Sequence, residues 1–398
     1  MLKFIELKGS PNFFETPDFT KIPILEKLVL EDCINLRKIH PSIGVHKKLT
    51  LLNLKGCKNI KSLPRKFEME SLEILILSEC SSLKRIPEFW ENMERVLELY
   101  LDGTAISKLP TSIGNLTGLA SLNARDCKNL MSLPSTFFNM KSLKYLNLSG
   151  CSKLENLGSA ESVDMIGTFK KIAFSGFQLL PFYSMSRSSD SMGLVSSSLF
   201  GLSSLISLNL SNCNLKEIPN DIGYLFSLRN LNLSGNNFGC LPKSITQLSI
   251  LTHLKVTNCR SLQSFPKLPS NIVYIEGYGC SSLEMVPNLL RPNSSFEPKL
   301  FLSNCSKLIG NQGFIDLFFS MIKKSPQVSL SLSLSLSLSL SLSAIMLCVF
   351  QGFSPNYYYE DRYDVVFPGS EMPEWFSHQC MGDKVNIMEP FLSCVMSG

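Results

Sequence analysis

A single leucine spacing organises most of this chain of 398 residues. The pattern Leu-x-x-Leu-x-Leu-x-x-Cys-x-x-Leu-x-x-Leu-Pro recurs with steps of 21 to 24 residues inside each uninterrupted run. One copy cannot bury its own leucines, so copies of this length are expected to stack into an array with one continuous core. The copies begin at Leu2, Leu25, Leu49, Leu72, Val96, Leu119 and Leu143, and again at Leu205, Leu228, Leu251 and Ile272.

The Leu-x-Leu part of each copy predicts a short β-strand, because alternate residues of a strand point to the same face. Stacked strands would pair in parallel, and the Leu-Pro ending would stop the pairing because proline lacks an N–H donor. The expected fold is an α/β repeat solenoid, a leucine-rich-repeat horseshoe with a parallel β-sheet on its concave face. The repeats are expected to fill residues 1–310.

The repeat register explains most of the 13 cysteines. Cys33, Cys57 and Cys80 take the same place in successive copies. Because the cysteine count is odd and Lys3 and Glu6 interrupt any apolar export segment, we expect reduced thiols, buried where the chain leaves each strand. A zinc site is disfavoured, since the chain has no Cys-x-x-Cys pair and no histidine in this register, and we expect no metal.

The run of copies is interrupted by a step of 62 residues from Leu143 to Leu205. One decayed copy starting at Phe169, with Ile172 and Phe174 in register, would occupy part of this step. A serine-rich surface loop would occupy the rest, and both features are expected within residues 158–200.

Several segments carry residues beyond the leucine pattern. Asn232-Leu-Ser-Gly235-Asn-Asn-Phe238 and Leu262-Gln-Ser-Phe265-Pro-Lys-Leu268-Pro resemble the repeats of plant disease-resistance proteins. They are most similar to the TIR-NBS-LRR subfamily of the tobacco mosaic virus resistance protein N type. In that subfamily a Toll/interleukin-1-receptor domain and a nucleotide-binding domain precede such repeats.

The C-terminal region resembles the same subfamily. The segment 366–376 is similar to the signature of its C-terminal jelly-roll and immunoglobulin-like (C-JID) domain. This resemblance implies a partial β-sandwich over residues 344–398, which is shorter than a sandwich of about 100 residues. The motif residues are Pro368, Gly369, Ser370, Glu371, Pro373, Glu374, Trp375 and Phe376.

No enzyme is expected. Repeat register follows Met1 at once, and no Gly-Lys dipeptide is present for a phosphate-cradling loop, so the family's nucleotide site has no residues here and no cofactor is expected. Glu371 and Glu374 could form a carboxylate pair, but a solvated loop is the expected place for residues after a Pro-Gly turn. His378 and Cys380 lie too close in sequence to present an oriented base and nucleophile.

Residues 329–343 alternate serine and leucine without exception. We assign them, with a preceding helix, to a linker over residues 311–343. A dinucleotide expansion or a misread intron explains such a run most simply. A membrane helix, a collapsed linker and an added edge strand stay open as alternatives, because charge is absent from residues 325–359.

The outward positions of the strands are the expected binding surface. Their early half carries an excess of Glu and Asp and their late half a slight excess of Lys and Arg, which would orient a bipolar protein partner. The alternative is that these charges only keep a large sheet soluble. The candidate contact residues are Glu26, Lys27, Glu31, Glu73, Glu79, Glu98, Tyr100, Asp102, Arg125, Lys144, Tyr145, Arg229, His253 and Lys255.

A formal net charge of +5 without a clustered basic stripe argues against nucleic acid as a partner, and a membrane partner is not expected. The resemblance implies a non-enzymatic recognition module of an intracellular plant immune receptor, in the cytoplasm or nucleus. Its implied partner is a pathogen effector, the nucleotide-binding domain of a receptor, or both. A scaffold for an endogenous partner, a truncated non-functional gene product and a membrane-tethered receptor are the alternatives.

Overall fold

The computed structural model describes residues 2–154, 201–286, 299–302, 305–309, 363–365 and 385–387. The chain divides into two compact units. The first unit holds residues 1–122, 127–143 and 154–203, and the second holds residues 123–126, 144–153 and 204–398. Each unit is built from leucine-rich coils, as the register predicts.

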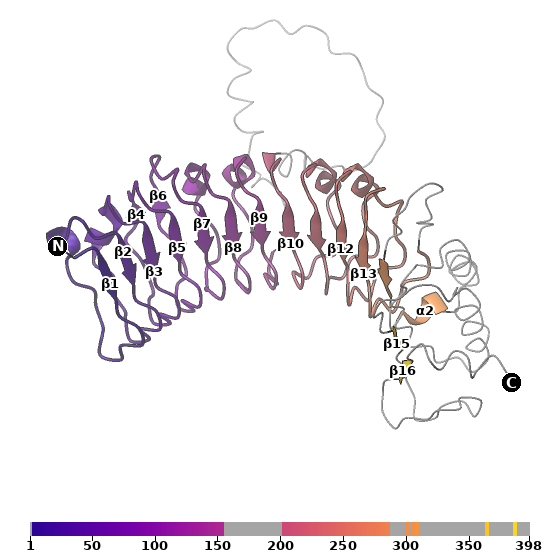
Figure 1. The fold of residues 1–398 in the computed structure, drawn as a ribbon, viewed down its shortest axis with the longest axis horizontal. Helices are drawn as coiled ribbons and strands as arrows, with labels where there is room; N and C mark the ends of the chain where they lie inside the picture. The colour runs from indigo at the N-terminus through magenta and orange to yellow at the C-terminus, as the bar shows by residue number, and fades with distance from the viewer. Residues whose placement is uncertain are drawn as a thin grey trace, which may run out of the picture. The chain divides into compact units, whose positions relative to one another are not determined.

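The strands of the large sheet in the first unit are only three residues long, and all but the first centre on a buried apolar residue. Successive strands pair in parallel with a shift of one repeat, so that Leu28 pairs with Leu52, and Leu52 with Leu75. Figure 1 shows β2, β3 and β5 running side by side. The strands are β1 (Phe4–Glu6), β2 (Lys27–Val29), β3 (Leu51–Asn53), β5 (Ile74–Ile76), β7 (Glu98–Tyr100) and β8 (Ser121–Asn123).

The return half of each first-unit coil is short and irregular. Prolines precede or open the 3-10 helices η2 (Pro41–Val45), η3 (Thr111–Asn115) and η4 (Ser135–Asn139), as expected of a residue with a fixed φ and no N–H. A further 3-10 helix, η1, spans Phe19–Lys21. Two coils instead form the small parallel pair β4 (Lys66–Phe67) and β6 (Glu88–Phe89).

The second unit repeats the same design. Its strands β9 to β14 pair in parallel and in chain order, with the buried leucines again in register. Two 3-10 helices, η6 (Asn220–Tyr224) and η7 (Lys243–Gln247), follow Pro219 and Pro242. The strands are β9 (Tyr145–Asn147), β10 (Ser207–Asn209), β11 (Asn230–Asn232), β12 (His253–Lys255), β13 (Tyr274–Glu276) and β14 (Lys299–Phe301).

The pairing of β9 with β10 corrects one sequence prediction. Leu146 pairs directly with Leu208, and the Leu148 N–H donates to the carbonyl of Asn209 at 2.9 Å. No strand of a decayed copy starting at Phe169 therefore lies between β9 and β10. Residues 155–200 themselves lie outside the described residues.

The C-terminal part is described only in short pieces. The helix α2 spans Ser306–Ile309, and β15 (Tyr363–Val365) pairs with β16 (Val385–Ile387) in antiparallel fashion. The Ser-Leu run and the motif from Pro368 to Phe376 lie outside the described residues, so the predictions for them stay predictions. Among the described helices, none has the length and apolar character needed to cross a membrane.

The core is a column of leucines closed by a row of thiols. Leu49, Leu52 and Leu54 are fully buried, as is Cys57. Burying one such leucine stabilises the fold by about 1.5–3 kcal/mol, so the repeated leucines dominate the stability. The thiol of Cys57 donates a hydrogen bond to the carbonyl of Leu30 in the preceding coil, with a sulfur–oxygen distance of 2.9 Å.

The thiol row confirms the expected role of the register cysteines. Each of Cys33, Cys57, Cys80, Cys127, Cys151, Cys213, Cys259, Cys280 and Cys305 donates to a carbonyl of the coil before it. In one coil Asn236 takes the cysteine's place, and its amide donates to the carbonyls of Leu210 and Leu233. The row thus gives each preceding coil a side-chain donor for one buried carbonyl, and some of these carbonyls, such as that of Leu54, also accept a backbone N–H.

From Cys33 to Cys280, the residue before each of these positions has a left-handed backbone, and its identity alternates from coil to coil. Glycine alternates with Asp, Glu or Asn, which tolerate this conformation better than most residues. A Cβ on Gly56 would come closer than 3.0 Å to the Asp32 carboxylate of the preceding coil, so the short residue is needed for packing as well as for φ. The row reads Gly9, Asp32, Gly56, Glu79, Gly103, Asp126, Gly150, Asn212, Gly235, Asn258 and Gly279.

Candidate functional site

The outward side chains of the repeat strands, together with the residues just before and after each strand, form a surface that we call the strand face. It is set by the strand alternation: inward leucines are buried, and their neighbours point away from the core. All fourteen contact residues predicted from the sequence lie in these strands or within three residues of them. We describe the face of each unit separately.

On β1 to β3, acidic residues of the first-unit strand face are compensated by lysines of neighbouring coils. The Nζ of Lys3 lies 2.7 Å from the Glu26 carboxylate. The Glu31 carboxylate lies 3.4 Å from the Nζ of Lys8 and 3.7 Å from that of Lys55. Because the opposite charges within these pairs largely cancel, Glu26 and Glu31 give the face less negative charge than the sequence predicted.

Further acidic residues of the first unit gather in the coils that contain β5 and β7. Glu73 and Glu79 are exposed and form no ion pair with any described residue. Glu98 accepts a hydrogen bond from the Tyr100 hydroxyl at 2.7 Å. This bond raises the pKa of Tyr100, so the phenol stays protonated at neutral pH.

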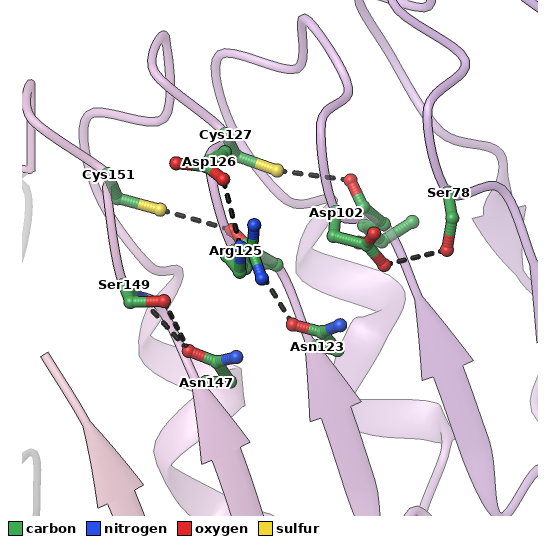
Figure 2. A network of polar contacts seen from close by, with 11 residues as sticks. Ser78, Asp102, Asn123, Arg125, Asp126, Cys127, Asn147, Ser149 and Cys151 are labelled. Carbon is green, nitrogen blue, oxygen red and sulfur yellow. Dashed lines mark hydrogen bonds and ion pairs between the residues drawn. The ribbon is translucent and has the colours of Figure 1, made fainter. Parts of the chain in front are cut away.

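Asp102 completes this acidic group. Its carboxylate accepts a hydrogen bond from the Ser78 hydroxyl at 2.6 Å, as Figure 2 shows. Glu73, Glu79, Glu98 and Asp102 are four carboxylates in two neighbouring coils, and we call them the acidic group.

Apolar side chains lie among these carboxylates, and the sequence analysis missed them because it considered only charged and polar-aromatic residues. Leu51 on β3 pairs with Ile74 on β5, and Ile76 lies on the same face of β5. Leu97, just before β7, is 47% exposed. Apolar residues at outward positions of the repeat were the signal that could have revealed them. We call Leu51, Ile74, Ile76 and Leu97 the apolar group.

In the second unit, Arg125 is exposed but already paired. Its Nε donates to the Asp126 carboxylate at 2.9 Å, as Figure 2 shows. Its backbone N–H donates to the Asn123 side-chain oxygen at 3.2 Å. Arg125 therefore adds little net charge to the face.

The predicted basic late half is weaker than expected. The Lys255 Nζ lies 2.8 Å from the Glu276 carboxylate of the next strand, so its charge is compensated. Lys144 and Arg229 are exposed and supply the remaining positive charge. The cross-strand pairing of Lys255 depends on the register of β12 and β13, which the charge count along each copy did not consider.

Aromatic residues add contact area to the second-unit face. Tyr145 is 51% exposed. The His253 ring stacks on that of Tyr274, with centroids 4.7 Å apart and planes at 20°. The strands β10 and β11 lie between β9, which carries Tyr145, and β12, which carries His253. Their outward positions are polar and hold Ser207, Asn209, Asn230 and Asn232.

The described residues offer little for catalysis or metal binding. No group of three or more His, Cys, Asp or Glu side chains that could hold a metal ion is found among them. Burial raises the pKa of Cys57 and Cys80 to about 12, so these thiols are poor nucleophiles and poor metal ligands at neutral pH. Glu371, Glu374, His378 and Cys380 lie outside the described residues.

Comparisons with known families match the repeats. The family described as disease resistance protein RPS4B-like, leucine-rich repeats, matches residues 68–165. The general leucine-rich-repeat family matches residues 204–225 and 227–248. Among solved structures, the leucine-rich repeat domain of the type III effector XopL is 19% identical, with 69% of this chain and 76% of that chain covered and a TM-score of 0.44.

Curated relatives extend over nearly the whole chain. Disease resistance-like protein DSC1 of Arabidopsis thaliana is 36% identical over 98% of this chain and 32% of its own length. Disease resistance protein RPS4B of the same plant is 30% identical over 96% of this chain and 25% of its own length. TMV resistance protein N of Nicotiana glutinosa is 32% identical over 68% of this chain and 25% of its own length. The chain thus spans about a third or less of the length of these relatives.

These matches confirm the resemblance, and the parallel sheet confirms the expected solenoid. The chain is a leucine-rich-repeat protein, related over most of its length to plant disease-resistance proteins.

Proposed function

We propose that this chain is a non-enzymatic protein-recognition region of an intracellular plant immune receptor. It binds a pathogen effector or a domain of the receptor through its strand face, and it acts in the cytoplasm or nucleus. The observation that carries the proposal is the acidic group with the apolar group beside it, on strands whose inward leucines already complete the core. Leu97 is exposed and the other three apolar side chains are partly exposed, and apolar side chains that reach the surface within a rim of charge are typical of protein-binding surfaces.

The kinship with disease-resistance proteins supports the immune setting. The same resemblance suggests that binding to the strand face contributes to signalling in a longer receptor. The charges of the acidic group would speed encounter with a positively charged partner, since complementary potentials act mainly on association rates.

The test is a pull-down with the tagged full chain, in which the nucleotide-binding region of a disease-resistance relative and purified pathogen effectors form separate arms. The proposal expects retention of at least one of them. Failure of both, together with stable retention of a host protein that has no role in defence, would favour a scaffold for an endogenous partner instead.

Charge reversal then locates the interaction. Glu73→Lys with Glu98→Lys is expected to slow association about tenfold or more at low salt, with a smaller effect at physiological salt because of screening. The matched control is Glu91→Lys with Glu94→Lys, which reverses the same number of exposed charges away from the strand face. Equal association rates for the two double variants would contradict electrostatic steering by the strand face.

A further inference from the structure

The apolar group is not a requirement of the fold. Leu51, Ile74 and Ile76 occupy outward strand positions at which other coils of the same design carry polar residues. In the second unit these positions hold Ser207 and Asn209 on β10, while Leu208 is buried just as Leu52 is. Because serine and asparagine serve equally well there, the apolar residues on β3 and β5 point to a partner rather than to folding.

The apolar and acidic groups interleave on the same strands. Ile74 pairs with Glu98 across β5 and β7, and Ile76 pairs with Tyr100. The Leu97 N–H donates to the carbonyl of Glu73 at 2.8 Å, which places Leu97 beside that residue. Neighbouring strands lie about 4.8 Å apart, so one ligand segment can contact an apolar side chain and a carboxylate on adjacent strands.

We infer that this part of the strand face receives a protein segment that carries leucine- or isoleucine-like side chains flanked by lysine or arginine. Apolar side chains of the segment cover Leu51, Ile74, Ile76 and Leu97 and exclude water from the surroundings of the carboxylates. Its basic side chains then meet Glu73, Glu79 and Glu98, where reduced access to water strengthens the attraction. This inference rests on the proposed function, because it names the partner chemistry of the same face.

The test uses three synthetic peptides whose binding to the full chain is followed by fluorescence anisotropy. One peptide combines lysine with leucine, one has the same lysines with serine in place of leucine, and one has the same leucines with glutamate in place of lysine. We expect the lysine–leucine peptide to bind about tenfold more tightly than the lysine–serine peptide, and the glutamate–leucine peptide to bind weakest. Equal binding of the lysine–leucine and lysine–serine peptides would show that charge alone acts and would overturn the inference.

Two variants locate the bound peptide. Leu97→Ser is expected to weaken the lysine–leucine peptide severalfold and Ile74→Ser about as much, because each removes one apolar contact. Met131→Ser is the matched control, since Met131 is also 47% exposed but lies outside the strand face. Thermal melting checks that all three variants fold, and Glu73→Gln provides a charge-only variant that leaves the apolar group intact.

The outcomes are distinguishable from those of the proposed function. If the peptide preference is absent while an effector or receptor domain is still retained, the partner chemistry is wrong and the recognition role stands. If the chain forms a concentration-dependent dimer that Leu97→Ser abolishes and Met131→Ser does not, a second copy is the occupant and the inference fails.

Discussion

The left-handed row offers a quantitative test of how neighbouring coils pack. Gly56 and Gly103 have nearly equal φ values of +71° and +70°. Alanine is therefore strained to the same degree at both positions, by about 1–2 kcal/mol. The surroundings differ, because a Cβ on Gly56 would come closer than 3.0 Å to the Asp32 carboxylate, whereas a Cβ on Gly103 has its nearest neighbour, the Glu79 Cα, at 3.5 Å.

Gly56→Ala must therefore displace the Asp32 side chain as well as strain the backbone. Moving a short side chain off its preferred rotamer costs about 0.5–1.5 kcal/mol. We expect the free energy of unfolding to fall by about 1–2 kcal/mol for Gly103→Ala and by about 2–3 kcal/mol for Gly56→Ala. Urea denaturation followed by circular dichroism measures the difference, with the same slope expected for both variants.

A double-mutant cycle isolates the contact. Asp32→Gly removes the carboxylate, so in the Gly56→Ala background it should recover about 0.5–1.5 kcal/mol relative to its effect in the unmodified chain. Equal losses for Gly56→Ala and Gly103→Ala would refute the packing argument. So would a Gly56→Ala loss that is unchanged when Asp32 is glycine, since the need for glycine would then come from φ alone.

The thiol row gives three further predictions. Burial raises the pKa of Cys57 and Cys80 to about 12 from an ordinary value of 9.0, so above pH 9 the unfolded chain loses protons that the folded chain keeps. Each thiol then lowers the free energy of unfolding by about 1.4 kcal/mol per pH unit, up to the folded pKa. Melting temperatures measured from pH 8 to 11 should therefore fall, and they should fall less steeply in Cys57→Ala. Cys57→Ser keeps a donor for the Leu30 carbonyl and should retain more stability than Cys57→Ala. In urea denaturation, Cys57→Ala should lose about 1–3 kcal/mol of the free energy of unfolding. The opposite order would mean that the hydrogen bond is unimportant. Among the described cysteines, Cys240 is exposed, so a thiol reagent at pH 8 should modify it before the buried thiols in peptide mass spectra; early labelling of Cys57 would contradict the burial.

The repeat architecture was predictable because its signal is local and repeated. The period of two within each strand and the constant coil length together fix which residues face the core, and the structure buries Leu49, Leu52 and Leu54 as expected. The burial of the register cysteines followed from the same register.

The number of coils between Leu143 and Leu205 was not predictable from leucine spacing, because an array accepts an extra coil without changing the register of the others. A subtler signal was present. Glycine and Asp, Glu or Asn alternate along the left-handed row, and Gly150 followed by Asn212 continues that alternation without an intervening coil. The direct pairing of β9 with β10 agrees with this alternation.

The candidate site was predicted only in outline. Outward strand positions follow from strand alternation, so the location of residues such as Glu98 could be predicted, while their role in binding stays a prediction. The apolar group was missed because residues such as Ile74 were not counted as surface residues. The predictions for the C-terminal motif, including Trp375, lie outside the described residues and stay predictions.

From the order of its residues alone, the chain specifies a stack of coils and the inward or outward direction of each strand side chain, since both depend on neighbours a few positions apart. Which charges stay available to a partner depends on residues about one coil apart. Glu31 and Lys255 are neutralised by neighbouring coils, whereas Glu73 is not. Such compensation is decided by the register between adjacent strands and the reach of long side chains, and only the folded array brings those together.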